Sequence, residues 1–334
     1  MKRFESTSIS RSGELDPAAS TVTQAMLGPQ DRATIVKAGG IDVLGLMKEG
    51  LLAPRRVASL RIAGLDAIRE EADGSLRIGS MATLGTIATH PLVASRYRAL
   101  AQAALGAASP QIRRVATIGG NLLQRPRCWY FRSAHHACTR KGGTHCYAFA
   151  GENDYHAIFR HEGCAIVHPS TPATALVALR AHLELEGAKG ARRTVALEDF
   201  LLGPDRDLHR ENDLRPGEIL TAVRLARTGE GSSSIHLRQG ELDSFDWPVA
   251  DVAAVLEMKD GICRSASIVL GAAAPVPYRA RSAERALAGR AIDAAAIDAA
   301  ARAAVEGAAP LSRNAYKVPM FVALVRRALA GVSR

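Results

Sequence analysis

The sequence predicts an α+β fold in two or three domains. The chain has 334 residues, which is too long for one small core. Its composition is globular, with 47% hydrophobic and 23% charged residues. Short β-branched runs alternate with helical patterns along most of the chain, and the last third gathers its helices at the end. These three observations predict domains that contain both sheets and helices.

The first elements suggest a phosphate-binding arrangement. Phe4 starts a possible strand, and Asp16-Pro17 resembles a helix start with an N-cap. The β-branched run at 34–38 predicts a buried strand, Gly39-Gly40 ends it, and 41–48 has a helical pattern. Glycines and free N–H groups at a helix start suit a pyrophosphate. A Gly-Gly turn between a strand and a helix is, however, more often only a turn.

The next elements lead to a second pair of glycines. Residues 57–60 and 76–79 predict strands, and 83–88 and 92–108 predict helices, the second one long and alanine-rich. Ser109-Pro110 stops that helix, and 111–116 leads into a glycine turn at Gly119-Gly120. Two strand-to-glycine turns in one domain could bind the two ends of one long ligand. The alternative is that the two turns are unrelated.

The remaining elements predict a sheet followed by helices. A helix is expected at 174–182, and a glycine–serine stretch at 229–234 suggests a domain boundary. Strands are expected at 193–197, 219–225, 235–238, 249–258 and 266–270. Helices are expected at 283–288, 293–305 and 318–329.

Charge and hydropathy exclude several classes of protein. The formal charge is +10, which permits nucleic-acid binding, but the basic residues are dispersed and only 4% of residues are aromatic. We therefore expect no nucleic-acid partner, and a basic surface that suits acidic partners or ligands. No run of about 18 apolar residues predicts a membrane span. The first residues lack the apolar core of a signal peptide, so we expect no export signal in the chain itself.

Four of the five cysteines lie within 37 residues, at Cys128, Cys138, Cys146 and Cys164. Their spacing matches neither a CxxC zinc knuckle nor the compact ferredoxin run. Four thiolates suit zinc or a 4Fe–4S cluster, and the spacing alone does not choose between them. Four unlinked buried thiols are the plainer alternative. Histidines crowd the same stretch, at 135, 136, 145, 156, 161 and 168. Cys263 is isolated and is expected to be a core thiol.

Several motifs together resemble a known family. They are Ala38-Gly39-Gly40 followed by Leu44-x-x-Met47-Lys48, then 108–113 (ASPQIR), 116–121 (ATIGGN), 244–247 (SFDW), 270–272 (LGA) and 277–279 (PYR). The chain resembles the FAD-binding subunit of the molybdenum hydroxylases, the xanthine dehydrogenase and aldehyde oxidoreductase type of enzyme. The resemblance covers essentially the whole chain.

The resemblance implies a vanillyl-alcohol-oxidase-type (PCMH-type) FAD-binding domain of two subdomains and a C-terminal α+β domain. The FAD-binding domain would span 1–228, with subdomains at about 1–56 and 57–228, and the C-terminal domain 229–334. Both glycine segments would then bind one FAD. The implied FAD-binding residues are Val36, Lys37, Ala38, Gly39, Gly40, Ile41, Asp42, Val43, Ser109, Thr117, Gly119, Gly120, Asn121, Thr171, Leu220 and Arg238. Leu220 would pack on the isoalloxazine ring, and Arg238 replaces a lysine that many members have near the flavin.

Two residues depart from the family pattern. Ile41 stands where the family usually has a threonine that bonds a phosphate, and Thr171 stands where it usually has an aspartate near the ribityl chain. Each lost interaction costs about 1 kcal/mol of cofactor affinity. The departures therefore weaken FAD binding without abolishing it.

The stretch at 125–167 resembles an insertion found in members that carry an additional 4Fe–4S cluster. On that resemblance Cys128, Cys138, Cys146 and Cys164 are the cluster ligands; the alternative is a structural zinc ion at the same cysteines. The resemblance implies an electron-transfer subunit of an enzyme that oxidises aldehydes or N-heterocycles. Its partners would be a large molybdenum-cofactor subunit, a small 2Fe–2S subunit and an external electron acceptor. The location would be cytoplasmic, or periplasmic with a signal-bearing partner.

Overall fold

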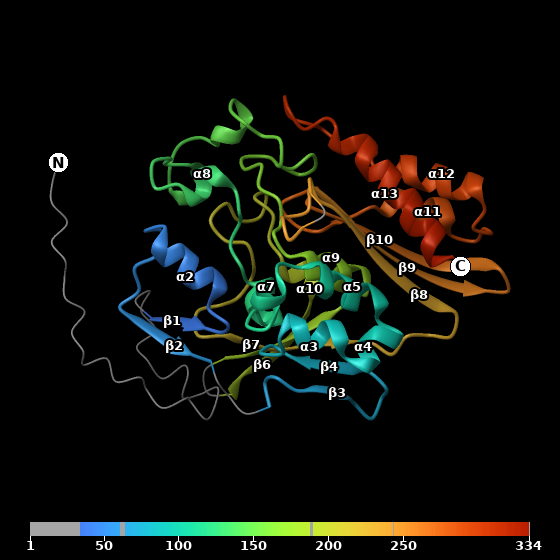
Figure 1. The fold of residues 1–334 in the computed structure, drawn as a ribbon, viewed down its shortest axis with the longest axis horizontal. Helices are drawn as coiled ribbons and strands as arrows, with labels where there is room; N and C mark the ends of the chain where they lie inside the picture. Colours follow the sequence, from blue (N-terminus) through green and yellow to red (C-terminus); the bar gives the residue numbers. More distant parts are fainter. Residues whose placement is uncertain (1–33, 61–63, 188–189, 243, 334) are drawn as a thin grey trace.

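A computed structural model describes residues 34–60, 64–187, 190–242 and 244–333. The expected strand at Phe4 and helix at Asp16-Pro17 lie outside these residues. The described part contains a two-stranded, a five-stranded and a four-stranded sheet, with helices between and over the larger two (Figure 1). The predicted α+β class is confirmed.

The two-stranded sheet holds the first glycine loop. Strand β1 (Thr34–Lys37) pairs in parallel with β2 (Arg56–Ser59), and helix α2 (Ile41–Lys48) connects them. Gly40 is the N-cap of α2 with φ 86°, a left-handed conformation that favours glycine. The predicted order of strand, paired glycines and helix is confirmed, but the strand is not buried as expected, since Val36 is 38% exposed.

The five-stranded sheet is antiparallel and has the order β3-β4-β7-β5-β6. Its strands are β3 (Ile68–Glu70), β4 (Leu76–Gly79), β5 (His182–Glu186), β6 (Arg192–Ala196) and β7 (Ile219–Leu225). The central strand β7 is almost entirely buried, which explains why five of its seven residues are apolar. The sequence predicted β4, β6 and β7 and missed β3 and β5. The helix expected at 174–182 ends at Ala178, and His182 begins β5.

The long helix expected at 92–108 is wrong, because it breaks at Tyr97. The chain forms α3 (Leu84–Thr89), α4 (Pro91–Arg96) and α5 (Arg98–Gly106), and Tyr97 between α4 and α5 has φ −129° and ψ 50°. The Tyr97 ring is buried and its hydroxyl donates to the Ala226 carbonyl at 2.8 Å. This long-range contact fixes the bend.

The strand-to-glycine turn expected at 111–120 is also wrong. Pro110–Arg113 forms the short helix α6, and Gly119 and Gly120 lie inside α7 (Ile118–Leu122). A Cβ at Gly119 would lie 2.9 Å from the Ser80 carbonyl oxygen, so close packing requires glycine here. Thr117 caps α7 by accepting a hydrogen bond from Gly120 N–H at 3.2 Å.

The C-terminal part is an antiparallel sheet under a layer of helices. Its order is β11-β10-β9-β8, from β8 (Ser232–Gln239), β9 (Ala250–Lys259), β10 (Ile262–Gly271) and β11 (Tyr278–Arg279). Helices α11 (Arg281–Leu287), α12 (Ala294–Ala303) and α13 (Lys317–Val332) follow, as predicted, and α13 packs on β8 and β9. Helices α5 and α9 (Thr171–Ala178) also contact this sheet, so one apolar core reaches both sheets.

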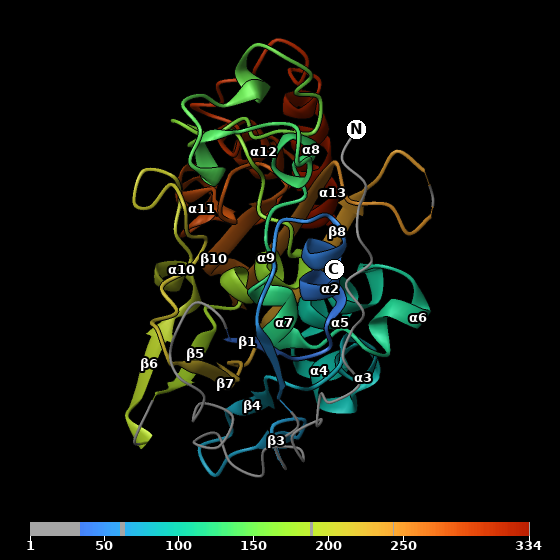
Figure 2. The same cartoon turned by 90° about the vertical axis from the view of Figure 1, so that its left-hand side faces the viewer.

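The cysteine segment has little regular structure. Between α7 and α9 it contains only α8 (Trp129–Arg132) and two 3-10 turns, η1 (Thr139–Lys141) and η2 (Tyr147–Phe149). Figure 2 shows this segment beside α2 and the C-terminal helices. A further short helix, α10 (Leu197–Phe200), follows β6. Among the described residues no helix has the length and apolarity to cross a membrane.

Candidate functional site

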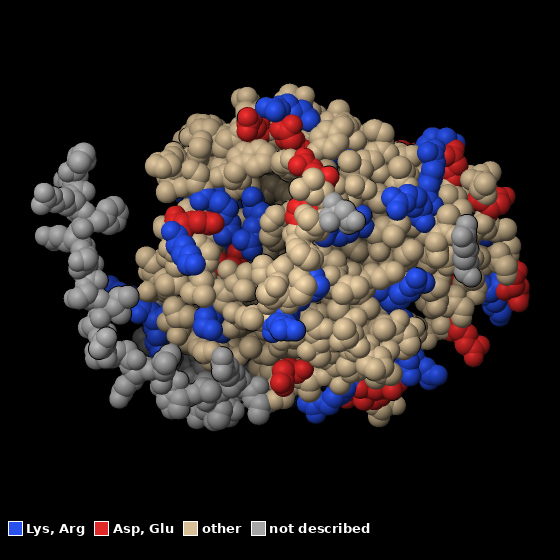
Figure 3. Space-filling model, viewed as in Figure 1, with Lys and Arg blue, Asp and Glu red and all other residues tan. Residues whose placement is uncertain are grey.

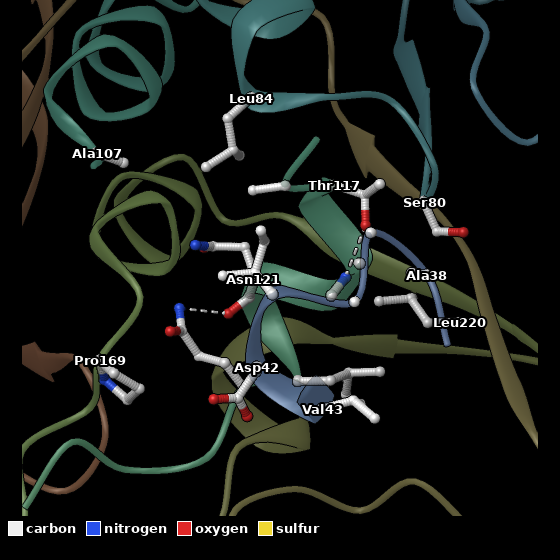
Figure 4. A pocket seen from close by; sticks show the side chains of 18 of the residues that line it. Ala38, Asp42, Val43, Ser80, Leu84, Ala107, Thr117, Asn121, Pro169 and Leu220 are labelled. Atoms are coloured by element: carbon white, nitrogen blue, oxygen red, sulfur yellow. Dashed lines mark hydrogen bonds between the residues drawn. The ribbon is translucent and has the colours of Figure 1, made fainter. Parts of the chain in front are cut away.

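A cavity of about 840 Å³ lies where the two glycine segments meet. Its walls come from the β1–α2 loop, α7, the start of β7 and the loop at 245–248. Figure 4 shows Ala38, Asp42 and Val43 lying across from Thr117 and Asn121 in this cavity. The volume is near the upper end of the range for small-molecule sites, roughly 300–1,000 Å³. The two glycine segments therefore face one ligand-sized space.

The first glycine loop offers unpaired N–H groups to the cavity. Those of Gly39 and Gly40 donate to no acceptor within the described residues, and the first-turn N–H groups of α2 have no partner inside the helix. A Cβ at Gly39 would lie 2.2 Å from the Val115 carbonyl oxygen. Glycine at these positions leaves the backbone N–H groups accessible to the cavity, which is what binding of an anionic ligand requires.

The second glycine segment is internally satisfied. The Ile118 and Gly119 N–H groups donate to the Ala82 and Ser80 carbonyls at 2.9 and 2.8 Å. Those of Gly120 and Asn121 donate to the Thr117 hydroxyl and carbonyl. The Asn121 side-chain oxygen accepts from Ser170 Oγ at 2.5 Å. This segment forms a fixed wall of the cavity, whereas the first loop supplies the free donors.

Most of the predicted FAD-binding residues line this cavity. They are Val36, Ala38, Gly39, Gly40, Ile41, Asp42, Val43, Thr117, Gly119, Gly120, Asn121, Thr171 and Leu220. Lys37, Ser109 and Arg238 are not among the lining residues. Ser109 caps α6 instead, by accepting from Ile112 N–H at 3.3 Å.

Arg238 holds a loop that sequence reasoning did not assign to the site. Its guanidinium donates to Asp246 Oδ1 and to the Gly106 carbonyl, both at 2.8 Å, and Asp246 and Gly106 line the cavity. Phe245 and Trp247 line it too, although their side chains are 60% and 52% exposed. The sequence contained the SFDW motif at 244–247, but the exposure of its aromatic side chains, which indicates binding, is visible only in the structure.

Asp42 connects the cavity to the cysteine segment. It lines the cavity, and its carboxylate lies 3.0 Å from Arg127 and 2.7 Å from Arg132. It also accepts from the Arg125 N–H at 2.9 Å. Figure 3 shows Lys and Arg side chains gathered between α2 and the cysteine segment, with acidic side chains among them. The start of the cysteine segment is thus held by a residue in the first turn of α2, directly after the first glycine loop.

The structure brings the four predicted metal-binding cysteines into one region. All four thiols are free, and Cys138 and Cys164 are buried. The Cys128 thiol interacts electrostatically with Cys164 and Cys138, and Cys146 hydrogen-bonds Cys164. Cys263 is a buried residue of β10, as expected for a core thiol.

Burial and neighbours shift the ionisation of these thiols. The hydrogen bond with Cys146, followed by the charge of Arg140, lowers the pKa of Cys164 to about 6. Burial raises the pKa of Cys128 to about 11, and the bond with Cys164 raises that of Cys146. Cys164 is therefore the cysteine most prepared to be a thiolate ligand.

Among the described residues, His156 is the only one of the six histidines in this stretch whose ring hydrogen-bonds a cysteine thiol. Its Nε2 lies 3.3 Å from Cys128 Sγ, and burial followed by the charge of Lys317 lowers its pKa to about 4. A neutral imidazole at this position serves as a hydrogen-bond partner of the thiol.

Unsatisfied buried groups concentrate around the cysteines. Among the described residues, five of the eight buried side-chain N or O atoms without a partner belong to 127–156: Arg127 Nε, Trp129 Nε1, Arg140 Nε and Nη2, and His156 Nδ1. Four of these belong to arginine or indole groups that only donate. Buried donors normally have acceptors. An acceptor-rich group such as a sulfide cluster fits this environment.

A single metal ion fits less well. In the part of the chain that the structure describes, no three His, Cys, Asp or Glu side chains are arranged to hold one ion. A zinc site needs its sulfurs about 2.3 Å from one point. In a 4Fe–4S cluster each cysteine binds through a larger inorganic core, so its thiols stand farther apart. Cys146 and Cys164 hydrogen-bond each other, so the case for the cluster rests on the unpaired buried donors and not on the spacing of the thiols.

The whole chain is similar to known flavoprotein subunits. Residues 6–227 match the family described as "FAD binding domain in molybdopterin dehydrogenase", and residues 236–332 match "CO dehydrogenase flavoprotein C-terminal domain". The aldehyde oxidoreductase FAD-binding subunit PaoB of Escherichia coli is 35% identical over 252 residues, 75% of this chain and 78% of PaoB. The carbon monoxide dehydrogenase medium chain of Hydrogenophaga pseudoflava is 29% identical over 91% of both chains.

Solved structures show the same fold. A chain of carbon monoxide dehydrogenase from Hydrogenophaga pseudoflava superposes with a TM-score of 0.71 at 28% identity and covers 94% of both chains. A chain of the reconstituted enzyme from Oligotropha carboxidovorans gives a TM-score of 0.72 at 27% identity, covering 94% of this chain and 95% of that one.

Proposed function

The chain belongs to the FAD-binding subunits of the molybdenum hydroxylases, and we propose that it carries electrons through FAD and a 4Fe–4S cluster. Its fold is a PCMH-type FAD-binding domain followed by a C-terminal domain of the carbon monoxide dehydrogenase flavoprotein type. Within this proposal the FAD-binding domain would span 1–228 and the C-terminal domain 229–334, with subdomains dividing near 56. The insertion at 125–167 is the part that carries the cluster.

FAD would bind in the cavity between the two glycine segments. The free N–H groups of Gly39 and Gly40 and of the first turn of α2 suit the pyrophosphate, and Leu220 suits the isoalloxazine face. Thr117, Gly119, Gly120 and Asn121 would shape the opposite wall. Arg238 and Ser109 would act from behind the lining residues, and the Lys37 side chain would stay beside its own loop.

The 4Fe–4S cluster would be held by Cys128, Cys138, Cys146 and Cys164. The observation that supports it most is the set of buried, unpaired donors around four free thiols. The chain's own residues would exclude water, supply thiolates and donate hydrogen bonds to sulfur. The chemistry of electron transfer belongs to the cofactors.

The enzyme would oxidise aldehydes, because the aldehyde oxidoreductase subunit is 35% identical; N-heterocycles are the second class, from relatives such as nicotinate dehydrogenase. A large molybdenum-cofactor subunit and a small 2Fe–2S subunit would deliver the electrons, and an external acceptor would remove them. The complex would work in the cytoplasm, or in the periplasm when exported with a signal-bearing partner.

Absorption spectra and metal analysis of the anaerobically purified chain test this proposal. We expect flavin bands, a broad iron–sulfur shoulder and about four irons per chain. Flavin together with one zinc ion per chain would show that the four cysteines bind a structural zinc ion and no cluster. A chain without flavin would contradict the FAD assignment.

A further inference from the structure

Arg140 is a buried cation with unused donors. It lies in η1, two residues after Cys138, and its side chain is 0% exposed. Its Nη1 donates to Glu211 Oε1 at 2.8 Å, whereas its Nε and Nη2 atoms are buried and have no partner in the described residues. A buried guanidinium with two of its three nitrogens unpaired is costly unless an acceptor completes it.

The position of Arg140 is fixed from behind. Glu211 also binds Arg125, with distances of 2.9 Å to Nη2 and 3.1 Å to Nε. Arg125 in turn donates to the His209 carbonyl at 3.1 Å. One carboxylate therefore faces two guanidinium groups, so positive charge remains, and Arg140 is not free to rotate away from the cysteines.

The guanidinium of Arg140 faces the cysteine site. Cys164 is the sulfur that its remaining donors approach: the two side chains interact electrostatically and by a hydrogen-bond contact, although neither Nε nor Nη2 makes a hydrogen bond of ordinary geometry. The same thiol receives the hydrogen bond of Cys146. On one side of the guanidinium, the Glu211 carboxylate already accepts a hydrogen bond from Arg140. The acceptor for the remaining donors must therefore come from the cysteine side, where the sulfurs lie.

We propose that Arg140 is a positioning residue that donates N–H···S hydrogen bonds to the Cys164 thiolate and the adjoining cluster sulfur, and so raises the cluster's reduction potential. This inference rests on the proposed 4Fe–4S cluster. Reduction adds one electron, supplied by a partner subunit or by FAD, and no proton moves. Hydrogen bonds to sulfur and nearby positive charge stabilise the more negative, reduced form. Arg140 thereby favours electron arrival at the cluster.

Three variants of the full-length chain test the proposal. Arg140→Gln removes the charge and the fork of donors, and Arg140→Lys keeps the charge in a compact group that cannot reach Glu211 and sulfur together. Arg160→Gln is the matched control. Arg160 lies in the same segment and pairs with Asp205 at 3.0 Å, but its side chain is 48% exposed.

The measurement is a redox titration followed by the EPR signal of the reduced cluster, with iron content and thermal unfolding determined in parallel. We expect Arg140→Gln to lower the equilibrium constant for one-electron reduction about tenfold, which is about 59 mV. Arg140→Lys should give a smaller shift in the same direction, and Arg160→Gln should give none.

Each outcome decides the matter. Iron-loaded Arg140 variants with the wild-type potential would overturn this inference and leave the proposed function intact. Loss of the cluster in both Arg140 variants would also overturn it, because Arg140 would then be required only for the local fold. A wild-type chain with flavin and no iron would overturn the proposed cluster itself.

Discussion

The cavity proposed to bind FAD is shaped mainly by backbone, whereas the cysteine site depends on side chains. Glycine residues, free N–H groups and apolar walls form the cavity, and the helices and strands around it hold them in place. The cysteine site has only one short helix and two 3-10 turns. Its shape depends on the contacts of its thiols, arginines and aromatic rings. Helices and strands form the first site without a ligand, whereas the second has buried donors with no partner among the described residues.

This difference implies that the two sites fail separately. The cavity should survive loss of the cluster, because its walls come from β1, α2, α7 and β7. The cysteine segment is linked to the cavity through Asp42, which holds Arg127 and Arg132. The following substitutions separate the two sites, beginning with the largest expected effect.

Cys138→Ser should remove the cluster and leave most of the FAD. Cys138 is buried between Leu46 and Phe131, and a serine hydroxyl is a poor substitute for a thiolate ligand. Iron should fall from about four per chain to nearly none, as measured by metal analysis with flavin quantified in the same sample. Cys263→Ser is the control, because that thiol is buried elsewhere, in the C-terminal sheet. Unchanged iron in Cys138→Ser would refute the ligand assignment.

Gly39→Ala should weaken FAD binding and retain the iron. The new Cβ would meet the Val115 carbonyl oxygen at 2.2 Å, so the loop must shift. Overpacking of about 1–3 kcal/mol corresponds to a loss of affinity of roughly five- to a hundredfold, measurable by flavin fluorescence titration. Gly45→Ala is the matched control in helix α2, which follows Gly39, since its Cβ would find its nearest neighbour at 3.9 Å. Equal affinities in both variants would contradict a backbone-built cavity.

Lys317→Met should flatten the dependence of stability on pH. Lys317 donates to the His156 carbonyl at 3.1 Å beneath the cysteine segment, and burial lowers its pKa from the ordinary 10.5 to about 7. Between these values the unfolded chain binds a proton that the folded chain does not, so the free energy of unfolding rises with pH across this window. The penalty is fully present below pH 7 and disappears towards pH 10.5.

Urea unfolding at pH 7, 8 and 9 measures the effect of Lys317→Met. The wild-type slope should exceed the variant's slope by up to about 1.4 kcal/mol per pH unit. Parallel slopes would show that Lys317 keeps an ordinary pKa in the folded chain.

Ile41→Thr should strengthen FAD binding slightly. Ile41 lines the cavity with its side chain 42% exposed, and a hydroxyl there restores the donor that the family usually has. One added hydrogen bond of about 1 kcal/mol raises the affinity roughly fivefold. Fluorescence titration should show this gain with unchanged iron content. A weaker affinity would show that no phosphate lies near position 41.

Local sequence patterns predict both sites that this comparison contrasts. The β-branched run before Gly39 and Gly40, and the density of cysteines, are visible without tertiary structure. The break at Tyr97 depends on a bond to Ala226, and the glycines of α7 depend on the backbone at Ser80, so neither was visible locally. The Arg238–Asp246 pair and the buried Arg140 likewise arise only when distant segments meet.

Reductive titration of the anaerobically purified full-length chain, without partner subunits, tests most directly whether it carries two redox groups. Dithionite should be consumed until about three electrons per chain are taken up, two by FAD and one by the cluster, with separate bleaching of the flavin and iron–sulfur bands. An end point at about two electrons, with bleaching of the flavin bands alone, would contradict the account.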